Sequence, residues 1–190
     1  MLVFLISINR DHSKSLKQAL KYGIDVYCNE DVANIITADK RRINIIEPLK
    51  KFKVGGFTIL PFDCQHTNQD GSECPNLGFL IQHKGLGKVL FATDTYYLKY
   101  TFKGLEHILI ECNYSERDLD IIPPERVRTL SSHMSLETLK DTLKTWDLSN
   151  TKDITLIHLS GEYGDPNYFK EEIQKATGCV VNIAGPGVTI

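Results

Sequence analysis

Several predicted strands of this chain lead directly into residues of the types that bind metal ions. The four pairs of apolar strand and following residue are Leu2–Ile6 with Asp11 and His12, Phe57–Phe62 with His66, Val89–Thr93 with Asp94, and Ile154–Ile157 with His158. In layered α/β folds, ligands and metals collect at strand ends, where the scaffold is rigid and the loops can vary. These positions offer three imidazoles and two carboxylates, which is the ligand class of hydrolytic Zn²⁺, Mn²⁺ or Fe sites. The pattern predicts a metal site.

Each of these residues taken alone also has an ordinary structural explanation. Asp11 suits the cap of the helix that follows it, and Asp94, between two threonines, suits a turn. A lone histidine at a strand end is more often a structural residue than a ligand. The predicted metal site therefore depends on the coincidence of four such strand endings.

The elements that must position these residues alternate along the chain. Runs rich in Val, Ile and Phe alternate with segments of helical periodicity, which predicts a mixed α/β (α+β) layered fold rather than an all-β sandwich. Further strands are expected at Asp25–Tyr27, Ile43–Ile46, Leu77–Gln82, His107–Glu111 and Cys179–Ile183, with a β-meander from Phe57 to Thr93. Helices are expected at Ser13–Leu20, Glu30–Ile36, Ser135–Trp146 and Asp165–Ala176, the last one stopped by Gly178. No linker divides residues 1–190, so we expect a single domain.

Composition and charge argue against several classes of function. The 22 Lys and Arg residues against 24 Asp and Glu give a net charge of -2, which provides no general attraction to nucleic acid or to an anionic membrane. The lysines form no basic stripe with interleaved aromatic residues. The apolar run at Leu2–Ile6 is too short to span a bilayer and follows no basic segment, so we expect a cytoplasmic protein. The five cysteines include no C-x-x-C pair, which indicates reduced thiols.

Five short motifs together resemble those of the metallo-β-lactamase superfamily. They are Asp11-His12-Ser13-Lys14, Pro-Phe-Asp-Cys-Gln-His66, Phe-Ala-Thr-Asp94-Thr, Ser-Ser-His133-Met-Ser and Leu-Ile-His158-Leu-Ser. The resemblance extends from Leu5 to Ile183 and is strongest to bacterial and phage-borne metallohydrolases of the phosphodiesterase and nuclease kind. It implies a four-layer αββα sandwich. Because Met1 falls almost on the metal-binding strand, we expect this sandwich to lack its first N-terminal strands.

The resemblance also implies roles for individual residues. The superfamily signature H-x-H-x-D-H falls on residues 7–12, where Ser7 and Asn9 replace its two leading histidines. The implied roles are ligand of a first metal for His66, ligands of a second metal for Asp11, His12 and His158, a bridging ligand for Asp94, and phosphate contact or proton donor for His133. A structural role for His133 at a helix start stays open. We therefore expect one ion rather than two, with Zn²⁺ favoured over Mn²⁺ or Fe, and Asp11 and His133 as catalytic candidates.

The resulting hypothesis is a metal-dependent hydrolase that uses a metal-bound water to attack a phosphodiester, either a small molecule or a nucleotide. Two alternatives stay open. The replacements at Ser7 and Asn9 favour a catalytically impaired relative that keeps at most one metal, and a metal-free binding or assembly module is the other alternative. An incomplete sheet would also expose the edge at Leu2–Ile6, which predicts a homodimer through that edge.

The remaining candidate residues receive structural interpretations. His83 and His107 lie outside the matched motifs, and Cys64 is expected to be a buried, inert thiol. Glu111 and Asn113 lie at the end of the predicted strand His107–Glu111 and are interpreted first as turn residues. Support of a histidine ligand is their alternative role.

Overall fold

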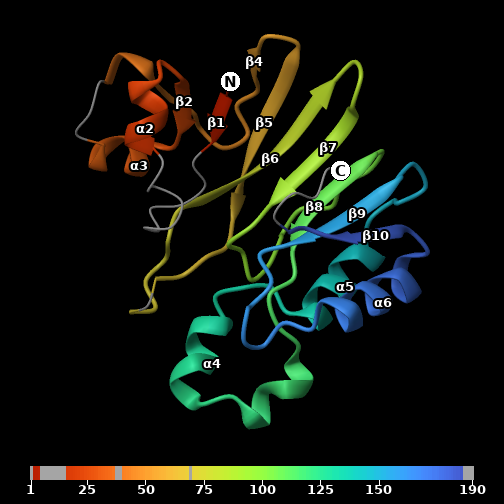
Figure 1. Ribbon diagram of the computed structural model, residues 1–190. Coiled ribbons are helices and arrows are strands. Elements are labelled where there is room, and N and C mark those ends of the chain that lie inside the picture. The colour runs from red at the N-terminus through yellow and green to blue at the C-terminus, as the bar shows by residue number, and fades with distance from the viewer. Residues whose placement is uncertain (1, 5–15, 37–39, 69, 186–190) are drawn as a thin grey trace.

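The computed structural model describes residues 2–4, 16–36, 40–68 and 70–185. Its strands form two sheets with helices beside them (Figure 1). The smaller sheet is parallel and has the order β1-β2-β3. This part of the chain comprises β1 (Leu2–Phe4), α2 (Leu16–Lys21), β2 (Asp25–Cys28), α3 (Glu30–Ile35), the 3-10 helix η1 (Lys40–Arg42) and β3 (Ile43–Ile45).

The larger sheet contains seven strands in the order β10-β9-β8-β7-β6-β5-β4. They are β4 (Phe52–Val54), β5 (Phe57–Cys64), β6 (Asn76–His83), β7 (Gly87–Ala92), β8 (His107–Glu111), β9 (Asp153–Ile157) and β10 (Val180–Ile183). Strands β7 to β10 pair in parallel, whereas β4 to β7 pair antiparallel and confirm the predicted meander. As a result β5, β7, β8 and β9 run in the same direction, and their carboxyl ends reach the same edge of the sheet.

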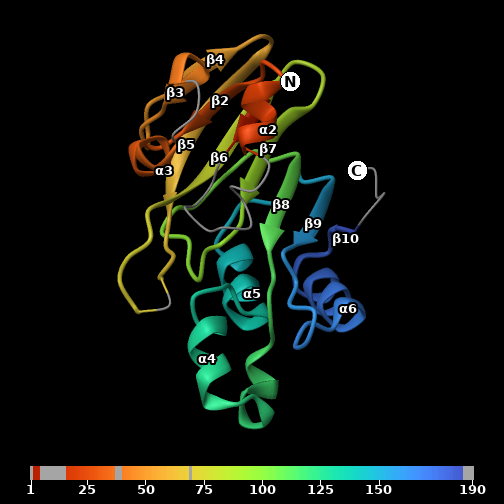
Figure 2. The ribbon, with the colours of Figure 1, turned by 60° about the vertical axis from the view of Figure 1, so that its left-hand side comes forward.

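The C-terminal half adds the 3-10 helix η2 (Glu116–Ile121) and the helices α4 (Pro124–Leu130), α5 (Leu136–Lys144) and α6 (Pro166–Thr177). Local sequence sets the ends of the last two. The side chain of Ser135 accepts a hydrogen bond from the Thr138 amide at the start of α5, and Asp165 caps α6 in the same way. Gly178, at φ 71°, takes the left-handed conformation that stops α6. Helix α4 lies beyond the end of the large sheet, away from the small one (Figure 2).

Three apolar layers hold the helices and sheets together. Leu20 of α2 and Val32 of α3 are buried and pack against the small sheet. Between the two sheets, the ring of Tyr27 in β2 stacks on that of Phe52 in β4, with 5.3 Å between centroids. The core between the large sheet and α5 and α6 includes Phe62, Leu90, Ile108, Leu139 and Phe169. The order is therefore helix, sheet, sheet, helix, which confirms the predicted αββα layers.

The structure also differs from the sequence-based expectation. Strand β4 and helices η2 and α4 were not predicted, because β4 has three residues and the α4 segment begins at a Pro-Pro pair with weak apolar periodicity. Strand β7 ends at Ala92, so the prediction that it includes Thr93 is wrong. The expected strand residues 5–6 and helix residues 13–15 lie outside the described residues. No helix in the described part of the chain is long and apolar enough to cross a membrane.

Candidate metal centre

Four strands of the large sheet deliver ionisable side chains to one edge. Glu111 is the last residue of β8, while His66, Asp94 and His158 each follow the end of a strand by one or two residues. His133 comes from the turn between α4 and α5. Each of Asp94, Glu111, His133 and His158 offers a ligand atom, and these atoms all lie within 4.8 Å of one another. Residues far apart in the sequence thus form one compact cluster.

The two carboxylates of the cluster are completely buried. Glu111 Oε1 lies 2.6 Å from His133 Nδ1 and 2.9 Å from His158 Nδ1, and Glu111 Oε2 accepts a hydrogen bond of 2.7 Å from the Thr95 amide. Asp94 Oδ1 lies 3.0 Å from His158 Nδ1 and 3.9 Å from His133 Nδ1. Because a carboxylate only accepts hydrogen bonds, both histidines turn a protonated Nδ1 toward it, which leaves each Nε2 for another partner.

The backbone at this edge is held in an unfavourable conformation. Asp94 (φ 50°) and His158 (φ 57°) are two of the three non-glycine residues with positive φ in the described part of the chain. Asn76 Nδ2 donates to the carbonyl oxygens of Thr93 (2.8 Å) and Asp94 (2.7 Å). Asn113 Nδ2 donates to the carbonyl oxygen of His158 at 2.7 Å. Such strain persists only where surrounding contacts enforce it, and it concentrates at functional sites.

The ring of His66 is a neighbour of the His133 ring. Its buried Nδ1 is 2.9 Å from the Ser132 carbonyl oxygen, so Nδ1 carries the proton and Nε2 has the lone pair. The ring centroids are 5.2 Å apart for His66 and His133 and 5.0 Å apart for His133 and His158. A histidine that donates one ring N–H to a carbonyl group or carboxylate is oriented as metal-ligating histidines usually are.

The charge balance of the cluster fits a bound cation. Burial alone would lower the pKa of His158, but its hydrogen bonds to Asp94 and Glu111 outweigh burial and raise the pKa to about 10. In the metal-free protein, protonated His158 therefore offsets part of the negative charge of the two carboxylates. A divalent ion would supply this positive charge instead, and imidazole and carboxylate groups are suitable ligands for it. The residues present therefore fit a metal ion.

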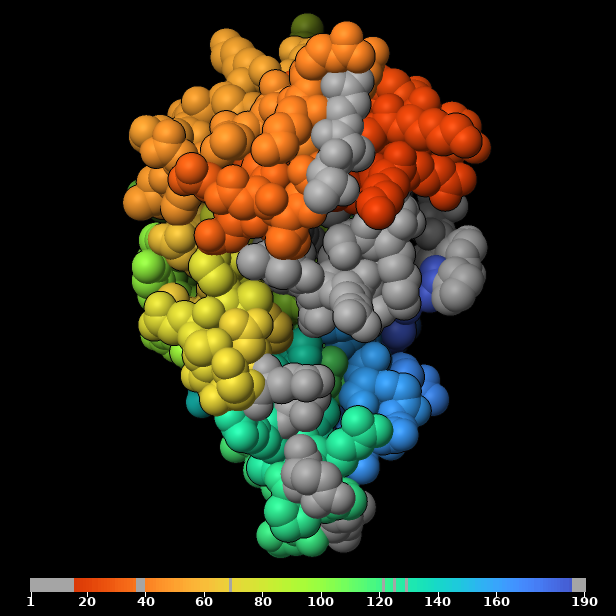
Figure 3. All heavy atoms as spheres, turned by 90° about the vertical axis from the view of Figure 1, so that its left-hand side faces the viewer, coloured from red at the N-terminus to blue at the C-terminus, as the bar shows by residue number. Residues whose placement is uncertain are grey.

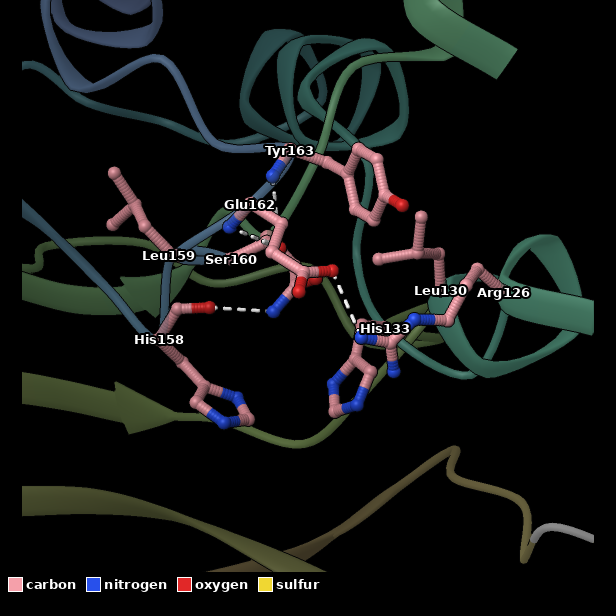
Figure 4. A pocket seen from close by; sticks show the side chains of 10 residues that line it. Arg126, Leu130, His133, His158, Leu159, Ser160, Glu162 and Tyr163 are labelled. Carbon is pink, nitrogen blue, oxygen red and sulfur yellow. Dashed lines mark hydrogen bonds and ion pairs between the residues drawn. The ribbon is translucent and has the colours of Figure 1, made fainter. Parts of the chain in front are cut away.

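A cavity of about 310 Å³ opens beside the cluster. His133 and His158 form one side of it, while Leu130, Leu159 and Tyr163 supply apolar surface (Figure 4). Figure 3 shows a face of the molecule on which the segment near residue 70, in yellow, and the region of α4, in green, lie below the red and orange N-terminal layer. The cavity places the cluster next to a space that a small molecule could enter.

The structure brings together four of the residues proposed from the sequence: His66, Asp94, His133 and His158. The other proposed ligands, Asp11 and His12, lie outside the described residues, as do Ser7 and Asn9. His107 instead pairs with Asp153, and the ring of His83 stacks on Phe57, with 4.5 Å between centroids. Burial raises the pKa of the Cys64 thiol above its usual range, which agrees with an inert thiol.

Glu111 is the residue that the sequence-based interpretation misjudged. Its preferred assignment as a turn residue is wrong, because Glu111 ends β8 and contacts two histidines of the cluster. The sequence pattern that identified His66, Asp94 and His158 is an ionisable residue at the end of an apolar strand. Glu111 has the same pattern. Asn76, which holds the turn at Asp94, has no comparable signal.

Solved structures with the same arrangement of layers share this fold. The metallo-β-lactamase fold protein YhfI from Bacillus subtilis superposes with a TM-score of 0.73 at 18% identity, covering 98% of this chain and 76% of YhfI. The chain has a metallo-β-lactamase fold. Igni18, a metallo hydrolase from the archaeon Ignicoccus hospitalis, gives a TM-score of 0.71 at 17% identity, covering 100% of this chain and 78% of Igni18. Unliganded yeast PDE1 gives 0.73 at 14% identity, covering 97% of this chain and 66% of PDE1.

The likeness between these metallo-β-lactamase folds lies in structure rather than in sequence. No protein-family model matches the chain, and no curated protein matches it in sequence. The identities of 18% and below show the fold alone.

Proposed function

We propose that the protein is a metal-dependent hydrolase of phosphodiesters and that Zn²⁺ is its metal. The observation that carries this proposal is the cluster itself, in which buried carboxylates and histidines from three strand ends and one turn meet beside a cavity. A purely structural cluster would gain little from the strained backbone at Asp94 and His158. Imidazole and carboxylate ligands without a thiolate are typical of catalytic zinc sites.

Asp94 and His158 are the described residues that would hold the ion. The sequence resemblance implies Asp11 and His12 as further ligands of this ion and His66 as a ligand at the other metal position. Zn²⁺ in such a site polarises a phosphoryl oxygen and makes a water molecule more acidic. The protein's own contribution is to keep the histidine rings oriented through Ser132, Asp94 and Glu111.

His133 is the residue we assign to proton transfer. Its Nδ1–H donates to Glu111 Oε1 at 2.6 Å, which fixes the tautomer and the orientation of the ring. Because His133 also lines the cavity, its Nε2 is the atom that would exchange a proton with a substrate or leaving group. Glu111 acts through His133 and is therefore a positioning residue.

Two observations support a phosphodiester as the substrate. Among the proteins with this fold, Igni18 is a metallo hydrolase and PDE1 is a phosphodiesterase. The cavity also joins the metal cluster to apolar side chains, an arrangement suited to a leaving group that carries a base or another ring.

The experiment that tests this function follows hydrolysis of bis(4-nitrophenyl) phosphate by the zinc-loaded protein. We expect turnover that EDTA abolishes, and His133→Gln should lower kcat about 100-fold or more, the size expected for loss of a general acid. The variant should keep its zinc content. His83→Gln is the control, since His83 lies outside the cluster and should leave kcat and zinc content unchanged. EDTA-resistant turnover, or full activity of His133→Gln, would contradict the proposal.

A further inference from the structure

An ion pair crosses one side of the cavity. Arg126 of α4 donates from Nη2 to Glu162 Oε2 at 2.8 Å, and Glu162 lies in the segment that follows His158. Figure 4 shows the Arg126 side chain extending from α4 across the cavity toward Glu162. Both side chains are accessible, at 51% exposed for Arg126 and 61% for Glu162. Both also line the same cavity as His133 and His158.

Arg126 is the one arginine or lysine among the described residues that line this cavity. The adjoining cluster holds two buried carboxylates, and Glu162 adds a third carboxylate at the rim. A substrate with a phosphate group therefore meets strong negative charge in this part of the molecule. The guanidinium of Arg126 is the cavity's permanent positive charge, since it stays protonated at any physiological pH.

The ion pair is easily exchanged for another anion. An ion pair between such exposed side chains contributes little to stability because water solvates both partners. Among the described residues, only Glu162 accepts a hydrogen bond from the guanidinium, and it uses one of five N–H donors. Arginine binds phosphate through two parallel hydrogen bonds, which is a better match than this single contact with a carboxylate.

We propose that Arg126 binds a phosphate oxygen of the substrate and that Glu162 occupies the guanidinium until the substrate displaces it. This inference rests on the proposed function, because it assigns the substrate contact of the same site. Arg126 then selects anionic diesters over neutral esters. Glu162 weakens the binding of every anion by competing for the same donor.

A purely structural ion pair makes a different prediction. If the pair only fastened α4 to the segment after His158, removing either partner would disturb the cavity in the same way. Arg126→Gln and Glu162→Gln would then change binding in the same direction. Competition for Arg126 instead requires that the two substitutions act in opposite directions.

The test measures binding of bis(4-nitrophenyl) phosphate to the chelator-treated full chain by isothermal titration, with KM of the zinc-loaded protein as the second readout. Arg126→Gln should raise both Kd and KM about 10-fold, which is typical for loss of a hydrogen bond to a charged group. Glu162→Gln should lower both by about 3-fold, since it removes a weak competing ion pair. Asp141→Asn and Lys144→Gln, which break an exposed ion pair of equal length on α5, should change neither.

Opposite shifts of Kd support the inference even if no variant turns over the diester, in which case only the proposed function fails. Parallel shifts in Arg126→Gln and Glu162→Gln would overturn it, and turnover in the same samples would leave the proposed function standing. Failure of the wild-type chain to bind the diester would also overturn it.

Discussion

The two ends of β8 and β9 both carry a histidine that contacts a carboxylate, yet the two pairs differ in burial, in the number of charged partners and in backbone conformation. At the amino ends, His107 Nδ1 lies 2.7 Å from Asp153 Oδ2. At the carboxyl ends, the Nδ1 atom of His158, which directly follows β9, lies 2.9 Å from Glu111 Oε1. The distances alone do not separate a functional pair from a structural one.

The two pairs differ in how deeply their side chains are buried and in how many charged groups contact each other. The side chains of His107 and Asp153 are 25% and 16% exposed, whereas those of Asp94 and Glu111 are completely buried. Glu111 contacts two histidines, and a second carboxylate lies beside them. The amino-end residues sit in regular strands, while Asp94 and His158 have positive φ. A buried excess of negative charge on a strained backbone is what a cation can stabilise, and the amino end lacks this combination.

The largest expected effect comes from Asp94→Asn. Asparagine keeps the size of the side chain and tolerates the left-handed conformation that Asp94 adopts, so the fold should survive. Loss of the carboxylate should weaken zinc binding by more than about 100-fold and abolish hydrolysis. This loss of affinity is larger than the loss expected when a residue that only orients a metal ligand is removed. Isothermal titration with Zn²⁺ measures this, with Asp153→Asn as the matched control at the other end of the sheet. Equal zinc affinity in the two variants would remove the distinction between the ends.

Glu111→Gln should have a smaller effect, because Glu111 orients His133 and His158 through hydrogen bonds. We expect zinc affinity to fall by about 10-fold to 100-fold, as for other groups that orient metal-ligating histidines. The pKa of His158 in the metal-free protein should fall as well, because its hydrogen bond to Glu111 helps to raise that pKa. An unaltered His158 pKa together with unaltered zinc affinity would mean that Glu111 serves the fold alone.

The smallest of these effects is expected for His107→Leu. Removing the donor leaves the Asp153 carboxylate, which is largely buried, without its histidine partner. The free energy of unfolding should fall by about 1–3 kcal/mol, the usual cost of such a group. Zinc affinity should stay within error of the wild type. Urea denaturation measures the free energy of unfolding, and zinc titration of the same sample measures the affinity. A loss of zinc binding in His107→Leu would mean that the amino ends of the strands also belong to the metal site.

Much of the fold follows from local sequence. Alternating apolar residues predict most strands, because one face of β5, β7 and β8 packs on α5 and α6. The caps at Ser135, Asp165 and Gly178 are visible in the sequence, because capping depends on contacts within one turn. Strand β4 and helix α4 lack such signals, since β4 is short and α4 has mainly polar residues. Their formation depends on tertiary packing.

The site follows from sequence only in part. Strand endings identify His66, Asp94 and His158, because parallel strands bring their carboxyl ends to one edge. The contact of Glu111 with His133 joins residues 22 positions apart, and no local pattern specifies it. The pairing of Arg126 with Glu162 also depends on where α4 lies relative to the segment after His158.

The most direct test of the metal centre is a crystal structure of the zinc-loaded protein with anomalous data collected at the zinc edge. We expect an anomalous peak at about 2.0–2.2 Å from an Asp94 carboxylate oxygen and from a ring nitrogen of His158. A zinc peak located only at His107 and Asp153, or no peak among Asp94, Glu111, His133 and His158, would contradict it.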